Sequence, residues 1–183
     1  TRSSRSEVST EAKSVIELLK GADFDLVLVE TAGIGQGDSE ITALADLTVY
    51  VMTAEYGAQS QLEKIEMLDH AEVVVINKFT RRGSEDALRD VRRVLARQKR
   101  FAGQKLEQLP VFGNSAAHFN DTGVNALAAS LTALMNERFD AHLSSSHDAG
   151  AVRASDAAQA IIPGGRERYL SEISGAVREH HRW

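Results

Sequence analysis

The chain has 183 residues, of which 43% are hydrophobic, and a formal net charge of −5. This length is enough for one hydrophobic core of domain size, and the acidic balance argues against binding to nucleic acid or to an anionic membrane surface. The sequence contains no cysteine, which excludes disulfides, thiolate metal sites and thiol catalysis. No apolar run approaches the ~20 residues of a membrane span, so we expect a cytoplasmic protein.

The first half of the chain alternates apolar segments with polar turns. A helix is predicted over residues 8–19, where apolar residues recur at helical spacing. Residues 24–29, rich in Val and Leu, predict a strand buried on both faces of a parallel sheet. Residues 47–52 predict a second buried strand, and a short helix is expected over residues 61–68.

The second half continues the same alternation. Residues 72–76 predict a third strand, followed by a charged helix over residues 84–100. A fourth short strand is expected over residues 110–112, and an amphipathic helix over residues 122–139. Strands that alternate with helices predict right-handed βαβ units, and therefore an α/β fold with helices on both faces of a parallel sheet.

Beyond residue 140 the composition shifts to Ala, Ser, His and Asp. We expect residues 141–160 to be a flexible linker. His142 and His147 lie in it, but no fixed acid or third histidine accompanies them, which argues against a metal site. The last helix is predicted over residues 166–181, with an apolar stripe formed by Tyr169, Ile173 and Val177.

Ligands of parallel α/β sheets bind at the carboxyl ends of the strands. Glu30 stands at the end of the first predicted strand, and Gly33, Gly35 and Gly37 follow it. An acid in this place can reach Mg²⁺ through water, and glycine lets backbone N–H groups approach a phosphate closely. Three scattered glycines alone are more typical of an ordinary strand-to-helix turn. Two later motifs shift that balance toward a nucleotide site.

Those motifs are Asn77-Lys78 and Ser115-Ala116, each of which directly follows a predicted strand region. In guanine-nucleotide proteins an N-K-x-D loop contacts the base edge through Asn, covers its face with the Lys stem and accepts two hydrogen bonds at the acid. A Ser-Ala dipeptide after the next strand commonly completes such a pocket through backbone N–H groups. Each pair is a weak signal alone, and their order along a βαβ chain makes them more specific.

Three segments carry a resemblance to a known family: ETAGIGQGDSEI, INKF-x-RRGSEDALRDVRR and PVFGNSAAHFNDTGV. They resemble the GTPases that serve adenosylcobalamin-dependent acyl-CoA mutases, in particular G-protein domains fused to mutases of the isobutyryl-CoA type. The resemblance implies a P-loop-GTPase-like sheet. It also implies a partial G domain over residues 1–140, a linker over 141–160 and a helical connection to a mutase domain over 161–183.

The resemblance also implies roles for single residues. Glu30 would order Mg²⁺-bound water, and Gly33 would give its N–H to the γ-phosphate. Gln36 would lie with Asp38 and Glu40 in the loop that senses this phosphate, and its amide has little core to satisfy. The guanine pocket would contain Asn77, Lys78, Thr80, Ser115 and Ala116.

Residues 53–64 resemble a further switch segment that is distinctive of these mutase chaperones. Lys64 within it either helps to stabilise charge during hydrolysis or is a solvated residue on a short helix. Both interpretations stay open.

The sequence departs from the family pattern in two places. No G-x-x-x-x-G-K-[ST] loop occurs in it, although that loop holds the phosphates and the Mg²⁺ of such enzymes. Because the chain starts at Thr1 within polar sequence, we expect the P-loop part, and a cobalamin-binding domain before it, to be missing. Thr80 stands where the N-K-x-D acid is expected, and a hydroxyl cannot accept both bonds that guanine offers.

These features predict part of a chaperone domain that hydrolyses GTP with Mg²⁺ and gates adenosylcobalamin loading and protection of a fused acyl-CoA mutase. The parent would be a homodimer that binds GTP or GDP, and this fragment alone would be inactive. The alternative is a degenerate, non-hydrolysing G domain that acts as a scaffold between domains. A stand-alone metallochaperone GTPase is a third reading, against which the C-terminal helix argues.

Overall fold

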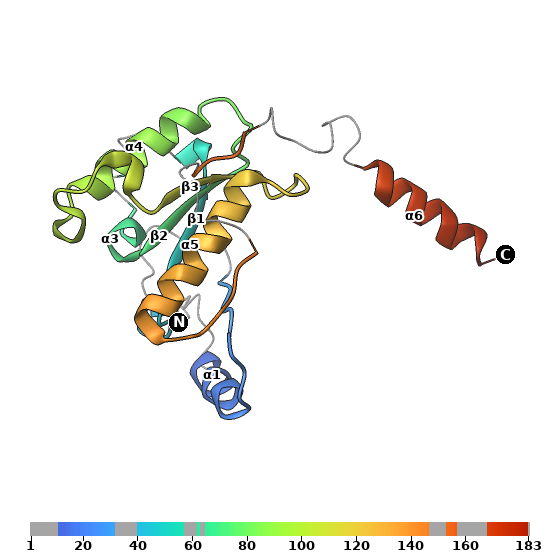
Figure 1. Ribbon diagram of the computed structural model, residues 1–183, viewed down its shortest axis with the longest axis horizontal. Coiled ribbons are helices and arrows are strands. Elements are labelled where there is room, and N and C mark those ends of the chain that lie inside the picture. Colours follow the sequence, from blue (N-terminus) through green and yellow to red (C-terminus); the bar gives the residue numbers. More distant parts are fainter. Residues whose placement is uncertain are drawn as a thin grey trace, which may run out of the picture.

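The structure is a computed structural model that describes residues 11–31, 40–56, 62, 65–146, 153–156 and 168–182. Its centre is a three-stranded parallel sheet in the order β1-β2-β3 (Figure 1). The parallel α/β architecture predicted from the alternating pattern is confirmed. The strands are β1 (Val49–Thr53), β2 (Val73–Asn77) and β3 (Val111–Asn114).

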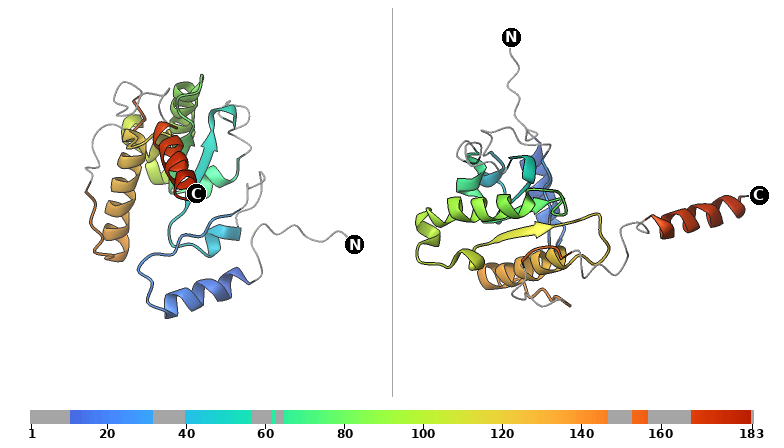
Figure 2. Two further views of the ribbon diagram at one scale, coloured as in Figure 1. Left: turned by 90° about the vertical axis from the view of Figure 1, so that its right-hand side faces the viewer. Right: turned by 90° about the horizontal axis from the view of Figure 1, so that it is seen from above.

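Helices cover the sheet on both faces. Viewed from above, α4 (Ser84–Ala96) and α5 (Thr122–Phe139) lie on opposite sides of β3 (Figure 2). α5 has the bounds that the sequence predicts, whereas the predicted helix over 84–100 ends earlier and continues as a separate short turn. Short elements complete the described chain: η1 (Glu40–Ala43), η2 (Ala54–Tyr56), α3 (Met67–His70), η3 (Lys99–Phe101) and η4 (Leu106–Gln108).

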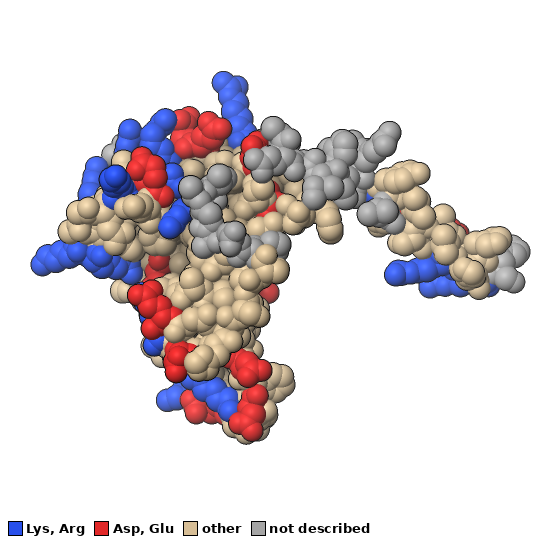
Figure 3. Space-filling view, in the orientation of Figure 1, with Lys and Arg blue, Asp and Glu red and all other residues tan. Residues whose placement is uncertain are grey.

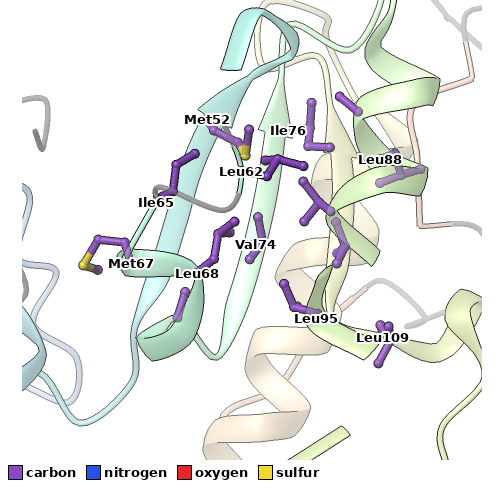
Figure 4. Close-up of a cluster of buried hydrophobic side chains, with 14 of the residues drawn as sticks. Met52, Leu62, Ile65, Met67, Leu68, Val74, Ile76, Leu88, Leu95 and Leu109 are labelled. Carbon is purple, nitrogen blue, oxygen red and sulfur yellow. The ribbon is translucent and has the colours of Figure 1, made fainter. Parts of the chain in front are cut away.

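The larger part of the core lies between the sheet and α3 and α4 (Figure 4). Val74 and Ile76 of β2 point into it, because alternate residues of a strand face the same side. Gly83 adopts a φ of 86° just before α4, a left-handed conformation that favours glycine. The polar face of α4 is turned outward, where Lys and Arg side chains gather (Figure 3). Its buried residues are Ser84, Ala87, Leu88, Val91 and Leu95.

A second cluster lies between the sheet and α5. Val73 and Val75 of β2 pack there with Phe112 of β3 and Ala126 of α5. α5 begins at this place because the Asp121 side chain accepts a hydrogen bond from the Val124 amide at 2.9 Å, a typical N-cap contact. The two faces of β2 are therefore both buried, as the sequence predicts for its apolar run.

The predicted strand over residues 24–29 is wrong. The structure assigns no strand there, and Phe24, Leu26 and Leu28 are exposed. A strand needs a neighbour that accepts its backbone hydrogen bonds, and the described residues provide none to this segment. The apolar composition therefore indicates a burial that the described residues do not provide.

Two terminal helices flank this body. α1 (Ala12–Gly21) lies below the sheet in Figure 1. Lys20 of α1 forms an ion pair at 3.6 Å with Asp46, which lies shortly before β1 in the chain. α6 (Tyr169–His180) stands apart from the sheet in Figures 1 and 2. Its predicted apolar stripe of Tyr169, Ile173 and Val177 is exposed.

Candidate functional site

The carboxyl ends of the three strands lie side by side. Thr53 of β1 pairs with Asn77 of β2, and Asn77 pairs with Asn114 of β3. The loops that follow these residues therefore start from one edge of the sheet. This is the edge at which parallel α/β sheets bind ligands, and two of the predicted motifs begin there.

The Asn77-Lys78 turn is docked against the end of β3. The Asn77 side-chain Oδ1 accepts the Lys78 amide at 2.8 Å and lies 3.4 Å from the amide nitrogen of Ala116. The Phe79 amide donates to the Asn114 carbonyl at 3.0 Å. Lys78 adopts a φ of 57°, a conformation that is uncommon outside glycine and typical of functional loops. The structure thus brings together two motifs that are separated by more than 30 residues in the sequence.

Phe79 and Gly113 make this docking possible, and the sequence analysis missed both. Phe79 is buried against β3, and a Cβ on Gly113 would lie 2.4 Å from its ring. Only glycine leaves that space. The available signal was the Gly directly after the apolar pair Val111-Phe112, since a glycine in or beside a strand often marks the close approach of another group.

Asp121 organises the loop that follows β3, and it too was missed. It is a buried carboxylate whose Oδ1 accepts from the amide of Ser115 at 3.3 Å and from the hydroxyl of Ser155 at 2.9 Å. The same oxygen caps α5. An Asp directly before a predicted helix is a usable signal for the cap, but not for its contact with the Ser115 loop.

The remaining predicted base-site residues differ in exposure. Lys78, Thr80 and Ala116 are exposed, whereas Ser115 is buried. The Ser115 hydroxyl has no hydrogen-bond partner among the described residues. Exposed groups around an Asn side chain and two successive backbone amides can bind a planar, hydrogen-bonding ligand such as a nucleobase.

Glu55 joins the loop after β1 to the loop after β2. It lies in η2, and its Oε1 is 2.5 Å from Nη1 of Arg81. The pKa of Glu55 is lowered to about 2, chiefly by a hydrogen bond from the Thr53 side chain, then by backbone and Arg81 hydrogen bonds. Glu55 is therefore an anion at neutral pH and holds Arg81 beside the Asn77-Lys78 turn.

Most of the residues predicted to contact phosphate or metal are not among the described ones. Gly33, Gln36, Asp38 and Lys64 lie outside the described residues. Glu30 is described and is exposed. Among the described residues no three His, Asp or Glu side chains gather as a metal site. Of the residues predicted for a nucleotide site, the described part of the chain brings together Asn77-Lys78 and Ser115-Ala116.

Comparison with known proteins agrees with this geometry. Residues 1–172 match the family Methylmalonyl Co-A mutase-associated GTPase MeaB. The chain belongs to this family. No helix in the described part of this MeaB-family chain has the length and apolar character to span a bilayer.

Relatives of two kinds resemble the chain. A fused isobutyryl-CoA mutase of Geobacillus kaustophilus is 43% identical over 182 residues, which is 100% of this chain and 17% of the relative. One of Nocardia farcinica is 48% identical over 96% of this chain and 16% of the relative. A probable GTPase of Mycobacterium tuberculosis is 35% identical over 39% of this chain and 21% of its own length. The chain thus spans about a sixth of the fused relatives' length.

Proposed function

We propose that this chain forms the guanine-recognition part of a GTP-hydrolysing chaperone domain in a protein fused to an acyl-CoA mutase. The observation that carries the proposal is the contact between the Asn77 side chain and the Ser115-Ala116 loop. Membership of the MeaB GTPase family supports the choice of a nucleotide as ligand. The exposed faces of Lys78 and Ala116 at the same edge of the sheet support a ligand that enters from solvent.

Each base-site residue has a chemical task in this proposal. The Ala116 amide, whose contact with Asn77 Oδ1 is long at 3.4 Å, donates toward the guanine O6, an acceptor that adenine lacks, while the Ser115 amide stays bonded to Asp121 and fixes the loop. The Asn77 amide group holds the loop through its oxygen and donates to the base through its nitrogen. The Lys78 stem covers the face of the ring, with its charged end in water.

Binding of phosphate and of Mg²⁺ requires residues beyond this recognition edge. The described side chains do not fit a metal site by themselves, and the sequence has no P-loop motif. We therefore assign metal-assisted hydrolysis to a complete domain. In it Glu30 would help to hold Mg²⁺, which would supply charge stabilisation for phosphoryl transfer, Gly33 would contact the γ-phosphate, and Gln36 and Lys64 would act during hydrolysis.

The proposal also covers the longer protein of which this chain would be part, and its fused mutase. The fused relatives are about six times longer than the chain, and we propose a cobalamin-binding domain and a mutase domain in that additional length. GTP hydrolysis would gate adenosylcobalamin loading and protection of the mutase, in a cytoplasmic homodimer. α6 supports a fused partner, because its apolar stripe finds no cover on the described G-domain body.

A second candidate is a degenerate G domain that serves only as a scaffold. Thr80 favours it, because the exposed hydroxyl at this position cannot replace a carboxylate that accepts two hydrogen bonds. A P-loop in the complete gene would decide for the hydrolysing function.

The deciding experiment measures GDP binding and GTP hydrolysis by the full-length protein. Asn77→Ala is expected to weaken GDP binding by about tenfold, because it removes one base contact and loosens the Ser115-Ala116 loop. Asn125→Ala is the matched control, since Asn125 contacts Asn120 on the neighbouring turn instead. Equal GDP affinity for wild type and Asn77→Ala would refute the assigned base site.

A second variant tests the departure at Thr80. Thr80→Asp is expected to improve discrimination of GTP over ATP by about 1–3 kcal/mol, since it supplies a charged acceptor for two guanine donors. Competition between labelled GTP and ATP measures this difference in the full-length protein. Unchanged selectivity would mean that the side chain at position 80 does not face the base.

A further inference from the structure

A short segment beyond α5 is attached to the outer edge of β3. Residues 153–156, here called the strap, form a parallel bridge between Ala154 and Gly113. The Gly113 amide donates to the Arg153 carbonyl at 2.9 Å, and the Ser155 amide donates to the Gly113 carbonyl at 2.8 Å. The strap lies within the segment predicted to be a flexible linker. These backbone contacts nevertheless hold its four residues on the sheet.

Side chains add to this backbone attachment. The Thr122 hydroxyl donates to the Ala154 carbonyl at 3.3 Å and accepts the amide of Asp156 at 3.2 Å. The Arg153 guanidinium donates to the Leu109 carbonyl at 2.9 Å and lies 5.2 Å from the centre of the Phe112 ring. The strap is therefore held by Leu109 just before β3, by Gly113 within β3 and by the first residue of α5.

The packing around the strap leaves no room for a side chain at Gly123, the second residue of α5. A Cβ on Gly123 would lie 2.0 Å from the Gly113 carbonyl and 2.9 Å from the Ser155 amide. Strap, strand and helix start thus meet at backbone distance. Such close contact makes the position of the strap and that of the loop after β3 interdependent.

One oxygen connects the strap to the base loop. Oδ1 of the buried Asp121 accepts the Ser115 amide at 3.3 Å and the Ser155 hydroxyl at 2.9 Å, the shorter of this hydroxyl's two contacts, the other being to the Gly113 carbonyl at 3.1 Å. Ser115 begins the loop whose next amide lies beside Asn77. A path of direct contacts therefore runs from the strap through Asp121 to the residues assigned to the guanine base.

We propose that the strap couples the segment leading to α6 with the nucleotide site, and that Ser155 is the positioning residue of this coupling. The inference rests on the proposed function, because it needs a nucleotide at the base loop. Detachment of the strap would take one hydrogen bond from Asp121 and weaken base binding. By thermodynamic linkage, a bound nucleotide must then hold the strap in place to the same extent.

The test uses Ser155→Ala in the full-length protein. GDP is expected to bind this variant about fivefold more weakly, as the loss of one hydrogen bond predicts, and with reduced selectivity over ADP. Ser155→Thr, which keeps the hydroxyl, should bind within about twofold of wild type. Ser174→Ala is the control, because Ser174 bonds to Ser171 on the exposed α6.

Hydrogen exchange measures the same coupling from the other end. GDP should slow exchange of the Ser155 amide in wild type, and this added protection should fall in Ser155→Ala relative to Ser174→Ala. A lower melting temperature with unchanged GDP affinity and selectivity would mean that the strap is only structural, which overturns the coupling. Wild-type protein that binds no GDP would instead overturn the proposed function, and the nucleotide end of the coupling with it.

Discussion

The two edges of the sheet differ in how far this chain completes them. At the β3 edge the strap supplies an additional strand contact, and Arg153 lies over Phe112. At the β1 edge no strand pairs with Val49–Thr53 among the described residues. Within the described residues, the β3 edge therefore has an additional backbone partner, whereas the β1 edge is open.

Two paired valines show the difference directly. Val51 of β1 lies opposite Val75 of β2 in the parallel register, so both side chains face the α5 side of the sheet. Val75 is 3% exposed, whereas Val51 is 57% exposed. α5 covers β2 and β3 but leaves β1 bare. The residues of β1 are as apolar as those of β2, and only the cover differs.

Residues 24–29 are a second apolar segment whose side chains are mostly exposed. Leu28 is 85% exposed, although the segment is as rich in Val and Leu as a buried strand. β1 and residues 24–29 thus both present apolar side chains that the described residues leave exposed. We expect the phosphate-binding part of the complete domain at this open edge.

The largest expected effect follows from that open edge. GTP should bind the isolated chain at least about 100-fold more weakly than the full-length protein, because the loss of two charge-assisted hydrogen bonds to phosphate removes about 3 kcal/mol. Calorimetry with Mg²⁺ measures both affinities. Micromolar binding of GTP to the isolated chain would contradict the assignment of its phosphate contacts to another part of the protein.

Adding one methyl group at Gly123 should disrupt the packing at the β3 edge. Gly123→Ala is expected to destabilise the isolated chain by about 3 kcal/mol, because its Cβ would collide with backbone atoms of β3 and the strap. Gly175→Ala in α6 is the control. No atom lies within 4 Å of its added Cβ, so it should be neutral or stabilise the helix by up to about 1 kcal/mol. Chemical denaturation gives both values, and equal effects would mean that the strap is not closely packed.

The paired valines give a smaller and more direct test. Val75→Ala should cost the isolated chain about 2 kcal/mol of unfolding free energy, and Val51→Ala less than about 0.5 kcal/mol. In the full-length protein Val51→Ala should become more costly, because the open edge is then covered. An equal cost of Val51→Ala in both proteins would show that β1 stays uncovered.

The success of sequence reasoning follows the same division. β2 and α5 were predicted well, because the partners that bury their apolar residues are within the described chain. Residues 24–29 were predicted wrongly, since strand formation depends on neighbours more than on intrinsic preference. A hydrophobic pattern alone therefore does not establish a strand where no pairing partner lies among the described residues.

The candidate site divides in a similar way. Asn77 and Ser115-Ala116 were found because each follows a strand directly, and parallel strands end at one edge. Asp121 and Ser155 were missed because their contact joins distant parts of the chain, and Ser155 lies in sequence of low apolar content. Sequence patterns locate groups on elements, but a side-chain contact between two loops requires the folded backbone.

The smallest expected effect concerns Glu55, which links the loop of the open-edge strand to Arg81 in the base loop. Its pKa in the folded chain is about 2, below the ordinary 4.5, with the Thr53 hydrogen bond as the first cause. A lowered carboxyl pKa stabilises the fold fully above pH 4.5, and this contribution is lost as the pH falls toward 2. The side chains of Glu55 and Arg81 are both exposed, so solvent screens the pair and the effect on stability is small.

An NMR titration of the Glu55 carboxyl carbon measures this contact directly. The wild-type midpoint should lie near 2. Arg81→Gln should raise the midpoint only in part, because the Thr53 and backbone hydrogen bonds remain, while Arg82→Gln should leave it unchanged. A wild-type midpoint at the ordinary 4.5 would show that Glu55 does not hold Arg81. In that case the open and closed halves of the sheet would be joined through β2 alone, and changes at the β1 edge would reach the base loop only through the strand pairing itself.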